Sequence, residues 1–499
     1  MSLAQAYNEL ARQAGNRMRV KSWIAPGLMV AVLTTFLLLP PVEPLTTVGM
    51  RTIGVFLFTV IGWMLIGTGY PSLLCVALFA LTGVMTPAAA FSAAWGNWLV
   101  FFMLAAFGLS EGLRVTGFSR RFALWFITRP FTAGRPWLLV AMFLLGCTIM
   151  GSIMSLTVTC IVFMTIAEPM LEGLGYKKGD PFAAMFMMGI AWAATASSAM
   201  TPVGHALNVL IIDLVQTDFN YTMNFAQWMA VGIPMGLLVF LMLLAIFRYV
   251  VRPDVSQFSD MAASYVREES GKMGAMKLEE KLAVAVFLGV VVCWILPGVT
   301  SNILPGVSAY LGEMGYAIPA IVGACLLCII RVKGKPLLTY RRWMLEGVEW
   351  STMALIGGIM VIAEIIGNPE TGIPQFLTGI FQPIATGAPF TIFLMITLLW
   401  VVLQTNLMSN LVSGSTIYKI MVPATAAAGV GNPVALAFVI TAAANYAFIL
   451  PSATTAPAIV TGSGWVPVGF LARYGVIMVI PIVLLFTFVG YPFACLLFR

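Results

Sequence analysis

Long apolar runs, separated by short polar connections, follow one another along this chain. A helix needs about 20 apolar residues to cross the hydrocarbon core of a bilayer, so these runs predict membrane-spanning helices. Hydrophobic residues make up 60% of the 499 residues and charged residues 9%. Because a soluble protein carries about 25% charged residues, this composition excludes a water-soluble fold. We expect an all-α polytopic membrane protein embedded in the lipid bilayer.

The charged residues lie in the connections and indicate how the chain is oriented. The net charge is +7, but the basic residues are scattered, so no nucleic-acid partner is expected. Connections 248–281 and 331–342 carry several Lys and Arg residues and should face the cytoplasm. Connections 213–227, 297–315 and 368–375 contain neither residue and should face outward. We expect a multi-pass protein of the inner (plasma) membrane with a cytoplasmic N-terminus.

An internal repeat relates two halves of the chain. The expected segments are a cytoplasmic tail (1–22), a first half (23–250), a cytoplasmic linker (251–281) and a second half (282–499). Ser155 and Ser409 are 254 residues apart, and Thr201 and Thr454 are 253 apart. Basic residues follow the interrupted apolar run of the first half but not its counterpart in the second. The halves should therefore face opposite sides of the bilayer, as in an inverted-topology repeat.

Four polar breaks interrupt otherwise apolar helices, two in each half. They are rich in Ser, Thr, Gly and Pro and cover residues 151–159, 195–208, 405–414 and 450–457. Breaks at membrane depth are tolerated where a cavity, an ion or neighbouring protein satisfies the freed backbone groups. Helix N-termini attract anions, and free carbonyl and hydroxyl oxygens suit a small cation such as sodium. The symmetric pairing favours a binding site over helix kinks with tight Ser/Thr packing.

The same breaks carry a resemblance to a known family. The sequences MSLTVT (154–159) and MSNLVS (408–413) stand where the divalent anion:sodium symporter family has its two Ser-Asn-Thr motifs. Residues 97–127 resemble that family's first re-entrant hairpin, and FILPSATTAPAIVTGSG (448–464) resembles its second-half signature. The resemblance implies a scaffold domain, a moving transport domain, a homodimer and elevator-type transport. It also implies two re-entrant hairpins, expected over about 95–117 and 350–372.

The resemblance further implies a site shared by the two halves. The residues expected to contact the substrate are Ser155, Thr157, Thr201, His205, Ser409, Asn410, Thr454 and Thr455. The residues expected to bind sodium are Thr405, Asn410, Ala453, Thr454 and Ser155. Leu156 and Leu411 each replace a polar motif residue, and Gly151 stands where the family has a hydroxyl. We therefore expect one sodium site in the second half and a weak or missing one in the first.

His205 is the only histidine of the chain and has two interpretations. A protonated imidazole can replace a lost cation or donate to an oxyanion. A neutral imidazole can instead hold the helix bundle together through a hydrogen bond. In the first case transport should rise as the pH falls through the histidine range, and in the second it should not.

Together these patterns predict a secondary active transporter of a small anion and not an enzyme. The default is sodium-coupled symport of a C4 dicarboxylate, with proton coupling as an alternative or an addition. A sulfonate or a monocarboxylate is an alternative substrate, because the Leu replacements make each end of the site less polar, and the resemblance adds sulfate as another. A membrane-embedded enzyme would need a catalytic constellation that one His and scattered Glu residues do not supply. A passive channel would need no paired hairpins, and no transition-metal site is expected.

Overall fold

The structure is a computed structural model, and nearly all of the regular structure that it describes is helical. It describes residues 24–127, 135–255, 271, 274–300, 303–387, 389–451 and 453–498. The predicted tail and most of the predicted linker lie outside the described residues. Seven of the described helices are long and apolar enough to span a membrane. The number is eight if α15 (Pro305–Met314) and α16 (Ala317–Ile329), bent by 76°, form one span. These findings confirm the predicted polytopic helical class.

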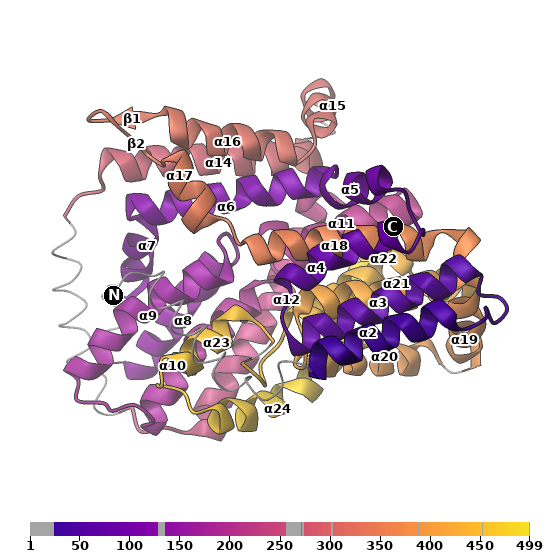
Figure 1. The fold of residues 1–499 in the computed structure, drawn as a ribbon. Helices are drawn as coiled ribbons and strands as arrows, with labels where there is room; N and C mark the ends of the chain where they lie inside the picture. The colour runs from indigo at the N-terminus through magenta and orange to yellow at the C-terminus, as the bar shows by residue number, and fades with distance from the viewer. Residues whose placement is uncertain are drawn as a thin grey trace. The chain divides into compact units, whose positions relative to one another are not determined.

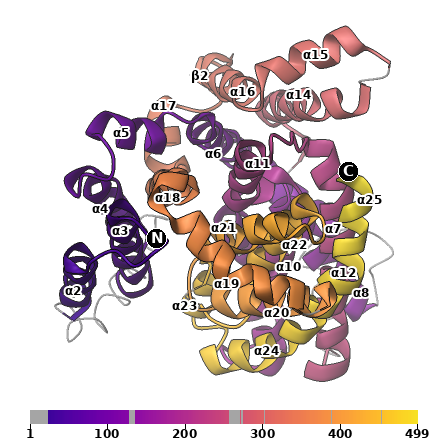
Figure 2. The same ribbon diagram turned by 90° about the vertical axis from the view of Figure 1, so that its right-hand side faces the viewer.

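The contacts within the chain divide it into two units, and the first unit comprises residues 1–97 and 350–383. Its described elements are α2 (Ile24–Leu38), α3 (Thr47–Leu65), α4 (Gly69–Leu81), α5 (Pro87–Trp95), α18 (Trp350–Gly367), η6 (Pro369–Thr371) and the first part of α19 (Ile373–Gly387). Helices α2, α3 and α4 lie side by side (Figures 1 and 2). Gly357 and Gly358 let α18 approach α5 and α4, because a Cβ there would lie 3.2 Å from Ala94 O and Ser72 Cβ.

The second unit comprises residues 98–349 and 384–499. The described elements of its first part are α6 (Trp98–Thr116), α7 (Phe118–Ile127), α8 (Pro136–Gly151), α9 (Leu156–Gly173), α10 (Pro181–Ser197), η2 (Pro202–Gly204), α11 (Ala206–Phe219), α12 (Phe225–Ile246), η3 (Phe247–Val251), α14 (Leu278–Thr300), α15, α16, β1 (Arg331–Val332), β2 (Lys335–Pro336), α17 (Tyr340–Arg342) and η5 (Trp343–Gly347). Those of its second part are the end of α19, α20 (Phe390–Thr405), α21 (Asn410–Ala428), α22 (Pro433–Asn445), α23 (Thr455–Gly462), α24 (Val468–Leu485), η7 (Phe486–Gly490) and α25 (Tyr491–Leu497).

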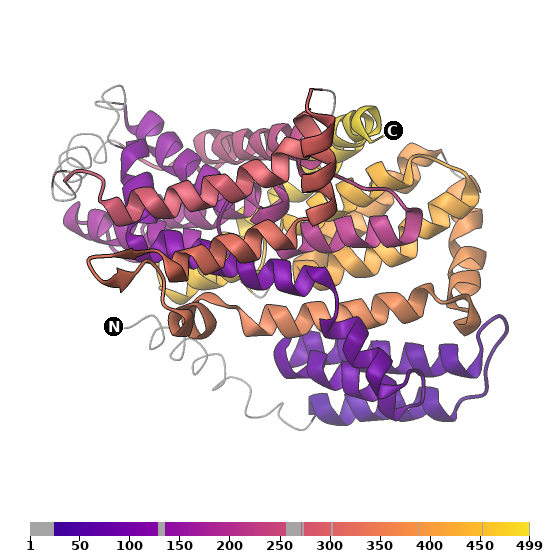
Figure 3. The same ribbon diagram turned by 90° about the horizontal axis from the view of Figure 1, so that it is seen from above.

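The interior of the second unit is built around α10 and α22. Every residue of α10 from Phe182 to Ser197 is buried, and so is every residue of α22 from Val434 to Asn445. A helix that is apolar on all sides is enclosed by other helices, here α8, α9 and α12 around α10, and α11, α20 and α21 around α22. Helices α6, α14 and α16 run alongside one another elsewhere in this unit (Figures 1 and 3). The breaks next to α10 and α22 therefore lie in its interior.

The order of helices in the second unit repeats at the offset seen in the sequence. Helices α8 and α20 have 16 residues each, and the helices that follow them, α9 and α21, each contain one proline, Pro169 and Pro423. Both of these helices begin at a serine with nearly the same backbone angles, φ −54° and ψ 140° at Ser155, and φ −54° and ψ 139° at Ser409. A break also follows α10 and α22 in turn. The local structures of the two halves therefore match, while their inverted orientation stays a prediction.

The structure differs from the two hairpins predicted over 95–117 and 350–372. Within these described stretches α6 and α18 are each a single uninterrupted helix. The chain turns after α6 at Gly117 (φ +94°), at the end of the predicted hairpin and not in its middle. The glycines that the sequence presents as interruptions are packing sites. A Cβ at Gly108 would lie 2.6 Å from the ring of Trp343, and one at Gly112 would lie 2.4 Å from Leu327. The helix pairs that bracket the two motif serines are α8 with α9 and α20 with α21.

Candidate functional site

The two motif turns place a helix N-terminus behind each motif serine. Ser155 is the N-cap of α9 and Ser409 is the N-cap of α21, and neither side chain bonds its own helix. The first backbone N–H groups of a helix have no partner within the helix, and helix N-termini hold the anion in many phosphate and carboxylate sites. The chain has two such N-termini headed by a serine, one in each half.

The turn of the first half is hydrogen-bonded to a carboxylate of the protein. The hydroxyls of Ser155 and Thr157 both donate to Oε1 of Glu349, each at 3.0 Å. The hydroxyl oxygens of Thr157 and Thr455 are hydrogen-bonded at 3.0 Å. The structure therefore brings together three of the predicted site residues from both halves. It adds Glu349, which the sequence did not indicate because it lies in a polar connection almost 200 residues further along the chain.

The break between α10 and α11 is held by bonds within the protein. The hydroxyl of Thr201 donates to the carbonyl of Ser152 and accepts from the N–H of Gly204 at 3.1 Å. The amide of Asn208 donates to the carbonyls of Ser198 (2.7 Å) and Thr201 (2.8 Å). Thr201, predicted as a substrate contact, thus uses its hydroxyl proton and one lone pair to fix the break against the first motif turn.

His205 ends this break as the N-cap of α11. Its Nδ1 accepts from the backbone N–H of Leu207 at 3.2 Å. Accepting this bond requires an unprotonated Nδ1, and the positive end of the helix dipole disfavours a second positive charge. The geometry therefore favours a neutral ring with its proton on Nε2 and counts against the protonated His205 considered from the sequence.

The second half contains a connected group of buried oxygens. The hydroxyl of Thr405 lies 2.8 Å from Oδ1 of Asn410 and 2.6 Å from the carbonyl of Ala444. The amide of Asn410 donates to the carbonyl of Asn445 at 3.2 Å, and the amide of Asn445 donates to Oδ1 of Asn208 at 2.7 Å. Thr405 and Asn410 were predicted as cation ligands and lie together. Asn208 and Asn445 extend the group across both halves, and their position beside a break is the signal that could have found them.

Three buried oxygens at the end of α22 and in the break that follows it have no hydrogen-bond partner among the described residues. They are Oδ1 of Asn445, the hydroxyl of Tyr446 and Oγ1 of Thr454. An unpaired buried polar atom is costly, so a break that keeps such atoms is suited to a ligand. Hydroxyl, amide and carbonyl oxygens are the ligands that hard cations prefer, and their donor chemistry fits sodium. Ala453, predicted to offer its backbone, is buried beside Thr454.

The first half has an oxygen where the sequence indicated none. A Cβ on Gly151 would lie 2.3 Å from Oγ of Ser197, so the serine hydroxyl fills the space of the missing side chain. Ser197 donates its proton to the carbonyl of Ala194 at 2.6 Å and keeps its lone pairs. The sequence expectation of a site without this oxygen is therefore incomplete, because the replacement comes from the neighbouring helix α10.

The fold and the site define a polytopic helical membrane protein whose halves meet at paired helix breaks, an architecture typical of secondary transporters. The sequence model described as the sodium:sulfate symporter transmembrane region matches residues 20–499, and the chain belongs to this family. This confirms the resemblance to the divalent anion:sodium symporter family.

Curated relatives agree with this membership. The chain is 25% identical to the sodium-dependent dicarboxylate transporter SdcS of Staphylococcus saprophyticus over 464 residues, which are 90% of this chain and 86% of that protein. It is 24% identical to SdcS of Staphylococcus aureus over 81% of this chain and 78% of that one. An uncharacterized transporter of Haemophilus influenzae is 23% identical over 68% of this chain and 69% of that protein.

Two solved transporters share the fold at low sequence identity. The YdaH transporter of Alcanivorax borkumensis aligns with a TM-score of 0.55 at 12% identity and covers 82% of this chain and 87% of its own. MtrF of Neisseria gonorrhoeae aligns with a TM-score of 0.52 at 12% identity and covers 93% and 94%. At this identity the likeness concerns the fold alone.

Proposed function

We propose that this protein is a secondary active transporter that moves a small organic anion, by default a C4 dicarboxylate, together with sodium. Family membership and relatives named sodium-dependent dicarboxylate transporters support the proposal. The observation that carries it is the pair of matching motif turns, each a helix N-terminus headed by a serine, next to buried oxygens that lack partners.

Each of the two motif turns would bind one carboxylate of a dianion. In the second half, Ser409 and the first N–H groups of α21 would hold one carboxylate. In the first half, Ser155 and Thr157 would hold the other through hydroxyls that already hydrogen-bond a carboxylate in this structure. Thr455, bonded to Thr157, would link the break at 450–457 to this end of the site.

The buried oxygens of the second half would bind the coupling cation. Thr405, Asn410 and Thr454, with backbone oxygens near Ala453, would replace the hydration shell of one sodium ion. Asn410 also begins α21, so a cation at this position would strengthen anion binding at the same helix N-terminus. Ser197 would give the first half a weaker second position. Coupling then follows from electrostatics, because each ion raises the affinity of the site for the other.

The movement that carries the site across the bilayer would be of the elevator type. A bare charge at the bilayer centre costs at least a few kcal/mol, so the anion must cross together with its compensating cation inside protein. The paired helices around the two motif turns would move as the transport domain within a homodimer. The inner membrane as the location and a cytoplasmic N-terminus belong to the same proposal.

Uptake by the purified protein in proteoliposomes tests the function. Labelled succinate should accumulate when sodium is higher outside and not when only a proton gradient is imposed. Competition by unlabelled sulfate, a sulfonate or a monocarboxylate ranks the alternative substrates. Succinate flux that equilibrates without following the sodium gradient would identify a passive channel, and uptake driven by protons alone would contradict sodium coupling.

A further inference from the structure

The two motif turns differ in the groups that their side chains bind, and the proposed function does not explain this difference. In the first, Ser155 and Thr157 both donate to the carboxylate of Glu349. In the second, among the described residues, no carboxylate is hydrogen-bonded to Ser409 or Asn410, and Asn410 is bonded to Thr405 and the Asn445 carbonyl instead. A residue of the protein therefore occupies the anion-binding donors of one half only.

A firmly anchored segment places Glu349 at this position. The ring of Trp343 packs on Gly108, and its Nε1 donates to the carbonyl of Leu104 at 3.0 Å. A Cβ at Gly347 would lie 3.0 Å from Cβ of Glu111, so η5 lies directly on α6. Because the chain is fixed up to Gly347, the carboxylate two residues further on has a restricted range.

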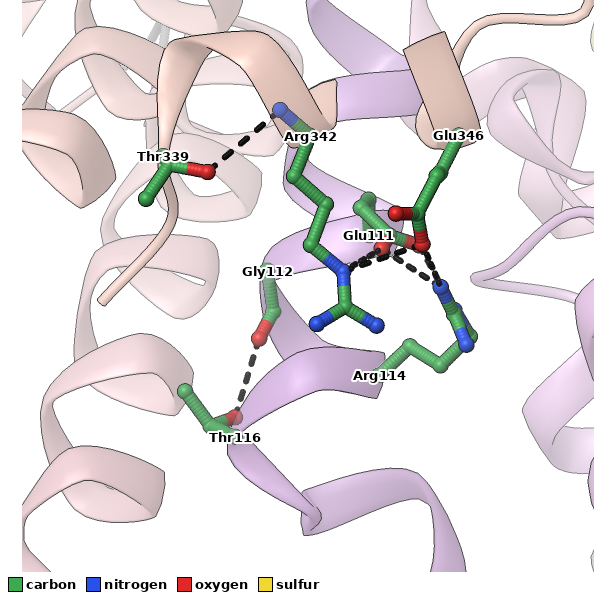
Figure 4. Close-up of polar contacts among 7 residues, drawn as sticks. All are labelled: Glu111, Gly112, Arg114, Thr116, Thr339, Arg342 and Glu346. Atoms are coloured by element: carbon green, nitrogen blue, oxygen red, sulfur yellow. Dashed lines mark hydrogen bonds and ion pairs between the residues drawn. The ribbon is translucent and has the colours of Figure 1, made fainter. Parts of the chain in front are cut away.

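Ion pairs around Glu111 reinforce this anchor (Figure 4). Glu111 is 2% exposed and accepts from both Nε and Nη2 of Arg114 at 2.6 Å. Arg342, just before η5, donates through Nε to Glu111 at 3.1 Å and lies 3.2 Å from Glu346. A buried carboxylate held by two guanidinium groups forms strong charge-assisted bonds. The α6–η5 anchor is thus a rigid base from which Glu349 reaches the turn.

Glu349 and a substrate carboxylate cannot use the first turn at the same time. A serine or threonine hydroxyl has one proton to donate. The proton of Ser155 goes to Glu349, and that of Thr157 lies between two acceptors at 3.0 Å, Glu349 and Thr455, so neither is left over for a substrate. Two carboxylates within a few ångströms of each other also repel. A dianion that engages both turns must therefore displace Glu349, whereas a monoanion held by the second turn need not.

We propose that Glu349 is a tethered carboxylate that occupies the first anion-binding turn when no substrate is bound, and that a dicarboxylate must displace it. The inference rests on the proposed function and deepens it. Glu349 then acts as a specificity-determining residue, because it lowers the affinity for dianions that span both turns and leaves monoanions unaffected. It also keeps the turn's hydroxyls satisfied in the empty carrier.

Replacing the charge of Glu349 tests the competition. Glu349→Gln keeps the shape but offers a neutral acceptor, and hydrogen bonds to charged groups are roughly twice as strong as neutral ones. The KM for sodium-dependent succinate uptake should fall about fivefold, while the inhibition constant of a monocarboxylate stays unchanged. Glu313→Gln is the control, since it removes the same charge at an exposed position of α15 that belongs neither to the anchor nor to the turn, and its KM should equal that of the wild type.

Two further variants separate occupation of the turn from general repulsion of anions. Glu349→Asp keeps the charge but withdraws the carboxylate by one methylene, so its succinate KM should also fall. In a Ser155→Ala background, Glu349→Gln should change the succinate KM much less than in the wild type, because the shared donor is gone.

Different results would contradict the inference about Glu349 and the proposed transport function. An unchanged or higher succinate KM in both Glu349 variants overturns the inference, and so does an equal fall in the Ser155→Ala background or for the monocarboxylate. Absence of sodium-dependent succinate uptake by the wild type overturns the proposed function and the inference with it. Melting temperatures of the purified variants, compared with that of the wild type, confirm that each variant is folded.

Discussion

The breaks at 195–208 and 450–457 have similar sequences, but their threonine hydroxyls have different roles. Thr201 donates to Ser152 and accepts from Gly204, so its bonds are made within the protein. Thr454, 253 residues later, is buried with no partner for its hydroxyl among the described residues. The sequence places both in matching breaks and cannot distinguish them, because the distinction depends on how α8 and α10 pack. At the residue scale, binding is therefore expected to depend more on Thr454 than on Thr201.

The first residue-scale prediction concerns Asn410. Its side chain links Thr405 to the carbonyl of Asn445 and begins α21. Asn410→Ala removes a ligand and leaves buried partners unpaired, at roughly 1–3 kcal/mol. The sodium concentration for half-maximal uptake should rise by about tenfold or more. Ser415→Ala is the control on the same helix, because that hydroxyl bonds only carbonyls of its own helix, and it should leave the sodium titration unchanged.

The second residue-scale prediction concerns the pH dependence of transport. His205 accepts the N–H of Leu207 at 3.2 Å, which favours a neutral ring that supplies no charge. Asn is among the preferred N-cap residues, so His205→Asn should retain folding and the wild-type pH profile, whereas His205→Ala should lose about 1 kcal/mol of stability. Uptake measured from pH 5.5 to 8 checks this. If wild-type uptake rises with acidification and His205→Asn abolishes that rise, the ring carries a proton and the neutral assignment is wrong.

At the element scale, glycines in α6 act as packing sites and not as breaks. Gly108 receives the ring of Trp343, and Gly112 receives Leu327. Both contacts fix α6 against later elements of the same unit, and one of them holds the segment that leads to Glu349. The helix is continuous because the tertiary contacts of its glycines outweigh their weak helix propensity.

The element-scale prediction is that a methyl group at Gly108 is not tolerated. Ala is the better helix former, yet its Cβ would lie 2.6 Å from the Trp343 ring, so Gly108→Ala should cost roughly 1–3 kcal/mol through strain. Thermal unfolding in detergent measures this cost. Gly306→Ala is the control in α15, where a Cβ would meet no atom of the described residues within 4 Å, and it should be neutral. Equal melting temperatures for the two variants would contradict the packing role.

The helical class, the repeat and the motif turns could be predicted from the sequence, and particular residues show why. Ser155 and Ser409 recur at a fixed offset, and the repeat of local sequence gives the same N-cap geometry. The contact of Glu349 with the first turn could not be predicted, since it depends on η5 packing against α6. The hydroxyl of Ser197 beside Gly151 was missed for the same reason. Local patterns identify elements, whereas contacts between distant elements require the packing itself.

At the scale of the whole molecule, the transported charge follows from how many cations accompany the anion. In the second half Thr405 and Asn410 lie in a connected group of buried oxygens, and Oδ1 of Asn445 has no partner among the described residues. The first half offers Ser197 in place of the residue missing at Gly151. One tightly bound sodium would leave a dicarboxylate with a net charge of −1 during transport. The membrane potential then opposes uptake, by about 2.3 kcal/mol per elementary charge at 100 mV.

The whole-molecule prediction is therefore electrical. In proteoliposomes with a fixed sodium gradient, a potassium diffusion potential that makes the inside negative should slow succinate uptake. Two sodium ions would make uptake indifferent to the potential, and three would accelerate it. Thr405→Ala should raise the sodium concentration for half-maximal uptake by about tenfold or more, because it removes a ligand of the principal site, whereas Ser197→Ala should change it only slightly. Acceleration by an inside-negative potential, together with an equally large rise in Ser197→Ala, would show that the first half binds sodium as firmly as the second.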